Sequence, residues 1–331
     1  MQYFINIEQL SFNLNLVGEF DCSQNTNLKS ISCYFNKLTT IDISQNPNLE
    51  FLKCHSNLLT SIDVTQNPLL NWLECDVNQI TNIDITQNPL LYWFNISSNQ
   101  ISSIDVSQNL NLEYLHCSRN QLSNIDVSQN LNLKRLAVSN NPISNLDVSQ
   151  NLDINRIHCD ETLITNLDLS LQQNLSILTC INTPFLNNLN IKNGNNLNLW
   201  WMWAYDNPNL MCIQVDDETE SRPWCDISET EGWCIDDWTE YSEDCSLGIE
   251  EFLETQVSLF PNPAKNILNI GNTSDSVVIA IKIYDVLGRL VLNQNNKFNQ
   301  IDVSHLVSGI LFVQIDTDEG RIIKKIIKDN Q

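Results

Sequence analysis

Apolar and polar positions recur along the first two thirds of the chain with a period of 21 residues. The string at 41–46, Ile-Asp-Ile-Ser-Gln-Asn, returns in similar form at residues 62, 83, 104, 125 and 146, with partial copies at 20 and 167. Between these copies lies a second pattern, clearest at 49–59 as Leu-x-x-Leu-x-Cys-x-x-Asn-x-Leu. Its alternation predicts a short strand with Leu52 and Cys54 pointing inward. One such unit cannot bury its apolar side alone, so stacked neighbours must complete a continuous core.

The second pattern resembles the leucine-rich repeats, with cysteine often in the sixth place, and specifically a bacterial class with 21-residue units. The resemblance implies a mostly β leucine-rich-repeat solenoid of about ten turns within residues 1–211. It also implies a second short strand, Ile-Asp-Val, on the opposite side of each turn. Asn57 and its equivalents are expected to form a ladder that satisfies backbone groups in the turn leaving each strand.

Seven cysteines lie within the repeats, at sites where other copies place larger apolar residues. They are Cys22, Cys33, Cys54, Cys75, Cys117, Cys159 and Cys180. A metal or redox column is one interpretation of this set. We favour small buried hydrophobic residues instead, because stacked side chains point in parallel and cysteine is commonly buried.

The period fails after Asn207-Pro208, where an acidic region rich in cysteine and tryptophan begins and spans 212–247. A solenoid end exposes an unpaired edge and an open core, so a cap is expected there. Residues 212–217, together with the Ser-Glu-Asp-Cys ending at 242–245, resemble the C-terminal cap of secreted bacterial leucine-rich-repeat proteins. The resemblance leads us to expect Cys212–Cys245 and Cys225–Cys234 bridges, although four cysteines permit three pairings and the sequence does not choose among them.

A linker at 248–256 leads into a tail, 257–331, of short alternating strands, which predicts a small immunoglobulin-like β-sandwich. Three motifs and a basic end follow one another: Phe-Pro-Asn-Pro-Ala-Lys at 260, Ile-Tyr-Asp-Val-Leu-Gly-Arg-Leu-Val at 283 and Leu-Val-Ser-Gly-Ile-Leu-Phe-Val at 306. Together they resemble the type A C-terminal sorting domain of the type IX secretion system. The motif residues are Pro261, Asn262, Pro263, Tyr284, Asp285, Gly288, Arg289 and Gly309.

The sorting-domain resemblance implies handling by the type IX machinery through 257–331, and then release or anchoring at the outer-membrane surface. An ordinary terminal β-domain is the alternative interpretation. No signal peptide is visible at the N-terminus, since a basic segment followed by an apolar run is missing. Because export also requires such a signal, we expect that the start of the chain is truncated.

The formal net charge is −23, and it is unevenly distributed. From 257 onward there are 8 Lys/Arg against 7 Asp/Glu, whereas the preceding residues hold 9 against 33. A surface this acidic disfavours nucleic acid and anionic lipid as partners. No stretch approaches the roughly 20 apolar residues that a membrane span needs.

The strand positions that should face the concave side carry a distinctive set of side chains. The column before the second leucine reads Phe51, Trp72, Trp93, Tyr114, Arg135 and Arg156, extended by Trp201 in the last turn. The next column includes Lys53, Glu74, His116 and His158, and the last turn adds Trp203 in a neighbouring column. Exposed aromatic rings suit stacking against sugar rings or capture of peptide side chains, and two neighbouring arginines suit a carboxylate or sulfate. The alternative is that the aromatic ladder only stabilises the sheet.

A column of aspartates, Asp42 and its equivalents, invites a calcium-binding interpretation. We favour carboxylates that accept N–H bonds from the following turn, because the calcium-loop spacing Asp-x-Asp-x-Asp-Gly is missing. We therefore expect no cofactor, with weak calcium binding to the acidic face as the remaining option. His116 and His158 stand two turns apart, roughly 10 Å by strand spacing, which is too far for one metal.

Catalytic motifs such as Gly-x-Ser-x-Gly, His-Glu-x-x-His and a phosphate-binding loop are missing from the sequence. An acid–base role for Glu74, Asp76 and His116 is conceivable but disfavoured. We therefore expect a monomeric, non-enzymatic recognition or adhesion protein for an extracellular protein or glycan. The alternative is a structural component of the cell surface or matrix without a specific ligand.

Overall fold

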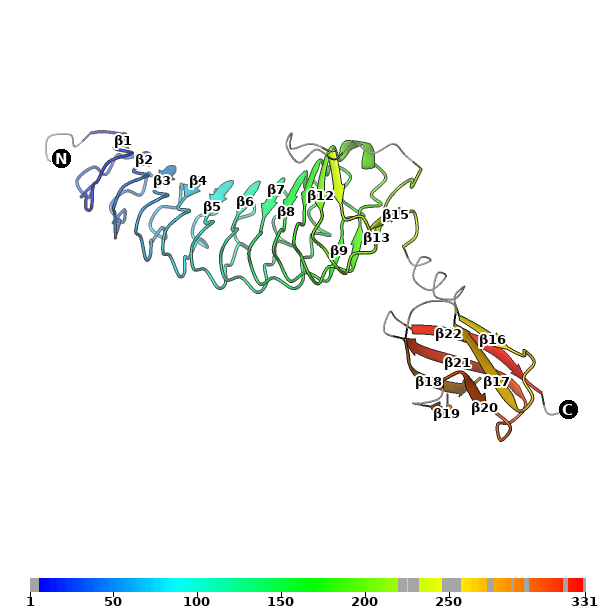
Figure 1. The fold of residues 1–331 in the computed structure, drawn as a ribbon. Helices are drawn as coiled ribbons and strands as arrows, with labels where there is room; N and C mark the ends of the chain where they lie inside the picture. The colour runs from blue at the N-terminus through cyan, green and yellow to red at the C-terminus, as the bar shows by residue number, and fades with distance from the viewer. Residues whose placement is uncertain are drawn as a thin grey trace. The chain divides into compact units, whose positions relative to one another are not determined.

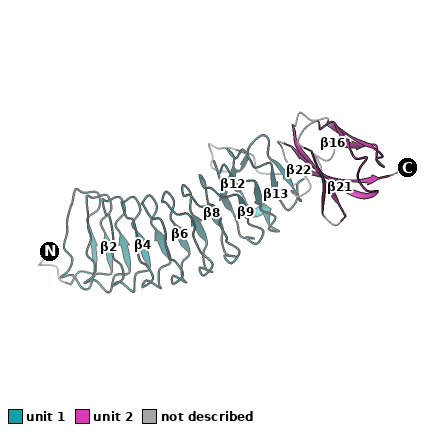
Figure 2. Cartoon of the chain, turned by 90° about the horizontal axis from the view of Figure 1, so that it is seen from below, with its two compact units in different colours: residues 1–243 teal, residues 244–331 magenta. Residues whose placement is uncertain are grey.

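The chain forms two compact units, residues 1–243 and 244–331, each described by itself below (Figures 1 and 2). The computed structural model describes residues 6–219, 225, 232–245, 257–272, 277–286, 289–294, 298–317 and 321–329. The first unit is a mostly β solenoid whose turns stack along one direction (Figure 1). Within the described part of the chain, no helix combines the length and the apolar character that crossing a bilayer needs.

One parallel sheet of eleven strands runs the length of the solenoid, in the order β1-β2-β3-β4-β5-β6-β7-β8-β10-β12-β14. Its strands are β1 Gln9–Ser11, β2 Ser30–Ser32, β3 Phe51–Lys53, β4 Trp72–Glu74, β5 Trp93–Asn95, β6 Tyr114–His116, β7 Arg135–Ala137, β8 Arg156–His158, β10 Ile177–Thr179, β12 Trp201–Ala204 and β14 Gly232–Ile235. Between β1 and β8 each strand pairs with the residue 21 positions on, for example Phe51 with Trp72. The 21-residue repeat of the sequence therefore fixes the register of the sheet.

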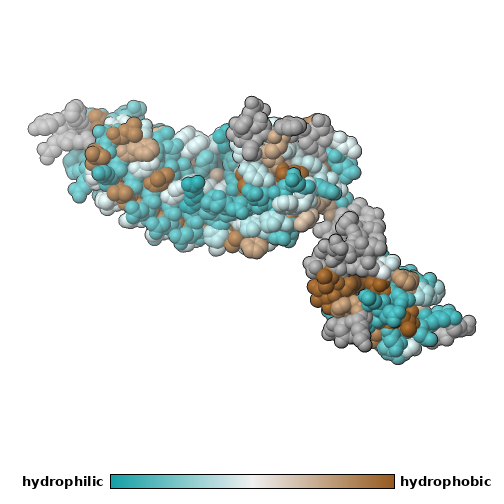
Figure 3. All heavy atoms as spheres, in the orientation of Figure 1, coloured by the Kyte–Doolittle hydropathy of each residue, from teal (hydrophilic) through white to brown (hydrophobic). Residues whose placement is uncertain are grey.

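The central residue of nearly every strand, such as Leu52 or Leu115, is fully buried, while its two neighbours face outward. The solenoid face seen in Figure 3 is accordingly mostly hydrophilic, with apolar residues in small patches. All seven repeat cysteines are free and buried, as predicted for core thiols. Burial raises the pKa of Cys117 to about 12, so this thiol stays protonated and unreactive at neutral pH.

The predicted second strand is wrong for the early turns. Among the described residues, a second parallel sheet, β15-β13-β11-β9, forms only at the C-terminal end, with β9 Asn166–Asp168, β11 Asn188–Asn190, β13 Cys212–Gln214 and β15 Glu240–Ser242. In earlier turns a side-chain amide joins neighbours instead of a backbone ladder. Asn88 Nδ2 donates to the carbonyls of Val64 (3.0 Å) and Asn67 (2.9 Å) in the preceding turn. The carbonyl of Val64 also accepts a hydrogen bond from the backbone amide of Asn67. It therefore has two donors without any strand pairing.

The predicted asparagine ladder occupies the turn that leaves each strand. In one turn, Asn120 Nδ2 donates to the carbonyls of Ile96, Cys117 and Ser118, while its Oδ1 accepts the amide of Ile101. The residue before each such asparagine has a positive φ, for example +56° at Arg119. This left-handed backbone is unfavourable for non-glycine residues, so the amide network holds the turn in a conformation that its own sequence disfavours.

The C-terminal end of the solenoid is closed by a short 3-10 helix, Asn196–Asn198, and by β12 to β15. Trp233 on β14 is 5% exposed, packs with the solenoid core, and meets the ring of Tyr241 edge-on at 5.6 Å between centroids. Cys225 is bonded to Cys234, and Cys212 and Cys245 are disulfide-bonded as well. Most of the acidic stretch between Thr219 and Gly232 lies outside the described residues.

The second unit consists of two antiparallel sheets, β16-β17-β20 and β19-β18-β21-β22. The strands are β16 Val257–Phe260, β17 Ile267–Asn272, β18 Val278–Asp285, β19 Leu290–Gln294, β20 Gln300–Asp302, β21 Gly309–Thr317 and β22 Arg321–Lys328. Buried aliphatic residues from both sheets, including Leu268, Ile301 and Val313, form one separate core. The unit is therefore the small β-sandwich that the alternating tail predicted.

Candidate functional site

The outward-facing residues of the long parallel sheet form columns in register, as the repeat alignment predicted. The strand pairings place Phe51, Trp72, Trp93, Tyr114, Arg135 and Arg156 in successive register in the first column, and Lys53, Glu74, Asn95, His116, Ala137 and His158 in the second. At the C-terminal end, Trp201 pairs with Ile177 and Trp203 with Thr179, so both tryptophans continue these columns.

The aromatic residues of the first column form a tight stack. Trp72 and Trp93 lie parallel, with ring centroids 4.4 Å apart and an interplanar angle of 2°. Phe51 stacks on one end at 5.3 Å, and Tyr114 lies against the other at 4.7 Å. The expected stacking of sugar rings on Trp72 and Trp93 therefore meets an obstacle, because each indole already covers one face of the other.

Four tryptophans of this face bury an indole N–H without an acceptor in the structure. They are Trp72, Trp93, Trp201 and Trp203. A buried indole N–H usually finds a hydrogen-bond partner, and leaving it unpaired costs free energy. If the aromatic ladder only stabilised the sheet, phenylalanine rings at these positions would avoid the cost of the unpaired N–H groups.

Charged groups along the N-terminal half of the face neutralise one another. Lys53 Nζ lies 3.3 Å from Glu74 Oε2 and over the ring of Trp72, 5.2 Å from its centroid. Beside this pair, the rings of Tyr34 and His55 stack at 4.6 Å. Desolvation raises the pKa of Asp76, the next acid on this face. Lys53 and Glu74 thus form a closed pair that offers little free charge to a ligand.

The two arginines differ from Lys53, because no acidic side chain within the described residues forms an ion pair with either. Arg135 and Arg156 occupy directly paired positions on β7 and β8. The guanidinium of Arg135 lies over the ring of Tyr114, 5.2 Å from its centroid. Burial and the charge of Arg135 lower the pKa of Arg156. Like charges on directly opposite strand positions repel, so this pair has an electrostatic cost that an anion would relieve.

The two histidines of the second column stand on either side of Ala137. Burial lowers the pKa of His116 to about 4, helped by the charges of His158 and Arg135. Burial is also the main cause that lowers the pKa of His158. Both imidazoles are therefore neutral at neutral pH. The described residues contain no group of three or more histidine, cysteine or acidic side chains suited to a metal.

The depressed pKa of His116 predicts a pH-dependent stability. The unfolded chain binds a proton near pH 6.5, whereas the folded chain binds it only near pH 4, so stability falls as the pH drops through this window. The loss should be on the order of 3 kcal/mol at most, from about 1.4 kcal/mol per pKa unit. Urea unfolding of the native protein and of His116→Asn at pH 7 and pH 4.5 measures this loss of stability. Between the two pH values, the variant should lose less free energy of unfolding than the native protein. Parallel pH profiles of the two proteins would contradict the assignment.

The aspartate column acts in the turns, as the favoured interpretation held. Asp42 Oδ1 accepts the backbone amide of Ser44 at 3.0 Å, and Asp105 does the same with Ser107 at 2.9 Å. These hydrogen bonds lower the pKa of both carboxyl groups. Both are therefore charged at neutral pH, and each accepts a backbone hydrogen bond from its own turn.

The sorting-domain motif residues close turns and edges of the second unit. Asn262 Oδ1 accepts the amide of Ile327 at 2.8 Å, which ties the Pro261–Pro263 segment to β22. Asp285 Oδ2 binds Arg289 Nε at 2.7 Å across the β18–β19 turn, next to Tyr284, while Gly288 lies outside the described residues. Gly309 begins β21 with a φ of +142°, a conformation that favours glycine.

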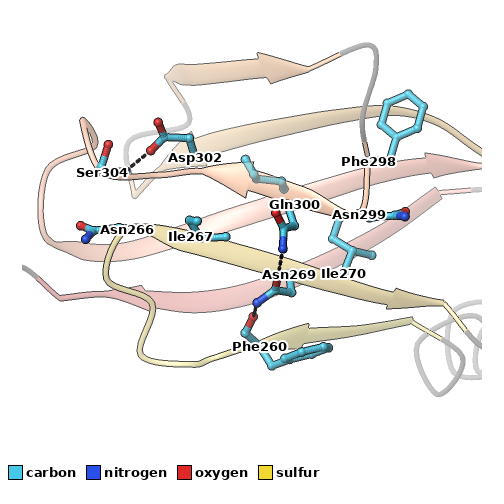
Figure 4. A pocket seen from close by; sticks show the side chains of 11 residues that line it. Phe260, Asn266, Ile267, Asn269, Ile270, Phe298, Asn299, Gln300, Asp302 and Ser304 are labelled. Carbon is cyan, nitrogen blue, oxygen red and sulfur yellow. Dashed lines mark hydrogen bonds between the residues drawn. The ribbon is translucent and has the colours of Figure 1, made fainter.

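An open hollow of about 1060 Å³ lies on the β16-β17-β20 sheet of this unit (Figure 4). Its lining is mostly amide and apolar: Gln300 Nε2 bonds to Asn269 Oδ1 at 3.2 Å, and Phe260 is half exposed. Asp302 is the acidic residue of the lining, and its carboxylate accepts the amide of Ser304 at 2.9 Å. These groups suit hydrogen bonding to a partner rather than acid–base chemistry.

Comparison with known proteins gives a family match within the second unit. Residues 258–329 match the family described as the secretion system C-terminal sorting domain. No curated protein matches the chain. Solved structures that are similar to the chain include the following three. The functional domain of InlJ from Listeria monocytogenes, described as including a cysteine ladder, has 20% identity and a TM-score of 0.40, covering 98% of this chain and 86% of that one. Internalin inlF from Listeria monocytogenes has 25% identity and a TM-score of 0.45, and the match covers 46% of this chain and 48% of that one. The leucine-rich-repeat domain of APL1B has 18% identity and a TM-score of 0.48, and the match covers 62% of this chain and 67% of that one.

The first unit is a parallel β-solenoid with a leucine-rich-repeat pattern in its sequence, as predicted, and residues 258–329 of the second unit match the secretion system C-terminal sorting domain. A sorting domain of this kind marks the chain as secreted or displayed at the cell surface.

Two features of the concave face escaped the sequence analysis. The first is the covered state of the indole faces, which depends on side-chain rotamers. The second is a hollow above Ala137, where a small residue interrupts a column of large polar ones. The alanine is visible in the repeat alignment, and the change in side-chain size was the available signal.

Proposed function

We propose that this protein is an exported, non-enzymatic recognition or adhesion protein that binds an extracellular protein or glycan on the concave face of its solenoid. The proposal rests above all on the meeting of the aromatic stack with Arg135 and Arg156 on one rigid sheet. Both arginines lack acidic partners among the described residues, although the chain carries a net charge of −23. Aromatic residues and arginine are the side chains most often dominant in binding energy. The buried indole N–H groups add a second reason to favour binding over sheet stability alone.

In this proposal the aromatic stack contributes through its edges. The edge of an aromatic ring carries partial positive charge, so oxygen atoms of a ligand are favoured there. Sugar hydroxyl and peptide carbonyl oxygens both fit this description. The sorting domain would be handled by the type IX secretion machinery, after which the chain is released or held at the outer-membrane surface. We propose that it acts as a monomer and without a cofactor.

The full chain and a Trp72→Ala/Trp93→Ala variant, screened side by side on glycan and extracellular-protein arrays, test this function. A ligand bound by the native chain should bind the variant at least about tenfold more weakly, because the central stack is removed. Phe185→Ala, which truncates an exposed apolar side chain, is the control and should bind normally. Equal urea midpoints of native protein and control establish the baseline against which unfolding of the double variant is judged.

Two outcomes would overturn the concave site. One is a ligand that binds the folded double variant at full strength. The other is a native chain that binds nothing on either array but self-associates, which would favour a structural component of the cell surface.

A further inference from the structure

The position of Ala137 in the second column produces a hollow in the concave face. The equivalent residues on the neighbouring strands are His116 and His158, so a methyl group stands between two imidazoles. The hollow measures about 470 Å³, and its lining also includes Arg135, Arg156, three serines and the carboxylate of Asp160. We call it the Ala137 hollow. Small residues flanked by large ones on a rigid sheet form a preformed site that needs little rearrangement to bind.

One wall of the Ala137 hollow is cationic. Arg135 and Arg156 lie side by side on paired strands, and neither has an acidic partner within the described residues. Other basic residues near the sheet are paired: Lys53 with Glu74 at 3.3 Å, and Lys134 with Glu113 at 2.9 Å. Two adjacent guanidinium groups present a fork of donors that matches the oxygens of a carboxylate or a sulfate.

The opposite side of the hollow provides hydrogen-bond acceptors. Thr179 Oγ1 donates its one hydrogen to Asp160 Oδ2 at 2.8 Å, so the 3.0 Å contact with His158 Nδ1 requires that the imidazole is the donor. Because His158 is neutral, this assignment leaves its Nε2 as an acceptor. His116 is neutral as well and has one acceptor nitrogen. A ligand that fits must therefore combine an anionic group with hydrogen-bond donors.

We propose that the Ala137 hollow binds one acidic sugar residue of a glycan, with its carboxylate or sulfate oxygens held between Arg135 and Arg156. The sugar hydroxyl groups donate to the imidazole nitrogens of His158 and His116. An acidic peptide offers only its backbone N–H groups as donors, whereas a sugar surrounds its acidic group with several hydroxyl donors, which favours the sugar. This inference rests on the proposed function and specifies its ligand. The strongly acidic chain repels extended polyanions, so a glycan with isolated acidic residues fits best.

The test measures binding of the full chain to four small probes by isothermal titration calorimetry. They are an oligosaccharide with a single terminal uronate, its uncharged methyl ester, the same oligosaccharide with a single sulfate, and a tripeptide with one glutamate. The native chain should bind the uronate or the sulfate probe at least about tenfold more tightly than the methyl ester and the peptide. The probe that binds more tightly identifies the acid.

Two variants locate the site. Arg135→Gln/Arg156→Gln should abolish the preference for the charged sugar, and Ala137→Leu should weaken binding by filling the hollow without changing the charge. Lys29→Gln/Lys37→Gln removes two positive charges from exposed positions near the N-terminal end and should bind as the native chain does. Urea midpoints show whether each variant is folded.

Several results would overturn the inference. They are native protein that binds neither acidic oligosaccharide, a charge preference that survives in Arg135→Gln/Arg156→Gln, normal binding by folded Ala137→Leu, and peptide binding as tight as sugar binding. An array ligand that depends on Trp72 and Trp93 but not on the arginines would refute this site and leave the proposed function standing.

Discussion

Replacement of Trp233 by alanine is expected to lower the free energy of unfolding by about 3–5 kcal/mol, the usual cost of truncating a buried tryptophan. Trp233 is 5% exposed, and on β14 it pairs with Met202 of β12, the last regular turn. Its indole nitrogen donates to the carbonyl of Leu199. Truncation opens the end of the core to water and leaves that carbonyl without this bond, so two costs add.

Urea unfolding of the full chain, followed by circular dichroism, measures the effect of Trp233→Ala. Trp238→Ala is the matched control, because Trp238 belongs to the same cap but is 51% exposed, and its loss should cost under about 1 kcal/mol. Hydrogen exchange should show the protection of β12 and β10 falling first, since a solenoid transmits stability between neighbouring turns. Equal midpoints for the two variants would mean that Trp233 does not close the core.

Loss of one rung of the asparagine ladder should have a similar effect. Asn120→Ala leaves the carbonyls of Ile96 and Cys117 and the amide of Ile101 without their side-chain partner inside a buried turn. Unsatisfied buried groups cost about 1–3 kcal/mol each, and partial relaxation limits the total to about 3–4 kcal/mol. The turn also loses the network that stabilises the positive φ of Arg119.

Two controls separate this mechanism from general damage, again by urea unfolding. Asn111→Ala removes an exposed amide with one bond, to Pro89 O at 3.1 Å, and should cost under about 0.5 kcal/mol. Asn120→Thr should cost less than Asn120→Ala, because the chain itself uses Thr162 at the equivalent position, where its hydroxyl bonds to Cys159 O at 2.9 Å. Asn120→Ala as stable as Asn111→Ala would show that the ladder does not hold the turns.

The sequence predicted the features that depend on the repeat itself. A fixed 21-residue period requires that equivalent residues stack in register, so buried leucines, core thiols and the Asn120 ladder follow from the alignment alone. The second strand was predicted wrongly for the early turns, because the Ile-Asp-Val segments are apolar enough for a strand. Side-chain amides such as that of Asn88 bind the carbonyls that a backbone strand ladder would use. The sequence does not show whether a side-chain or a backbone donor binds a given carbonyl.

By itself, the sequence determined which residues share one face of the long parallel sheet, because this follows from linear spacing, and its tail motifs resemble a sorting domain. Only the tertiary structure decided how those side chains meet. The 4.4 Å stack of Trp72 on Trp93 covers the ring faces that the sequence suggested were open. Lys53 pairs with Glu74, whereas Arg135 and Arg156 form no ion pair within the described part of the chain. These outcomes depend on rotamers and on distances of a few ångströms between residues 21 positions apart, which a periodic pattern does not encode.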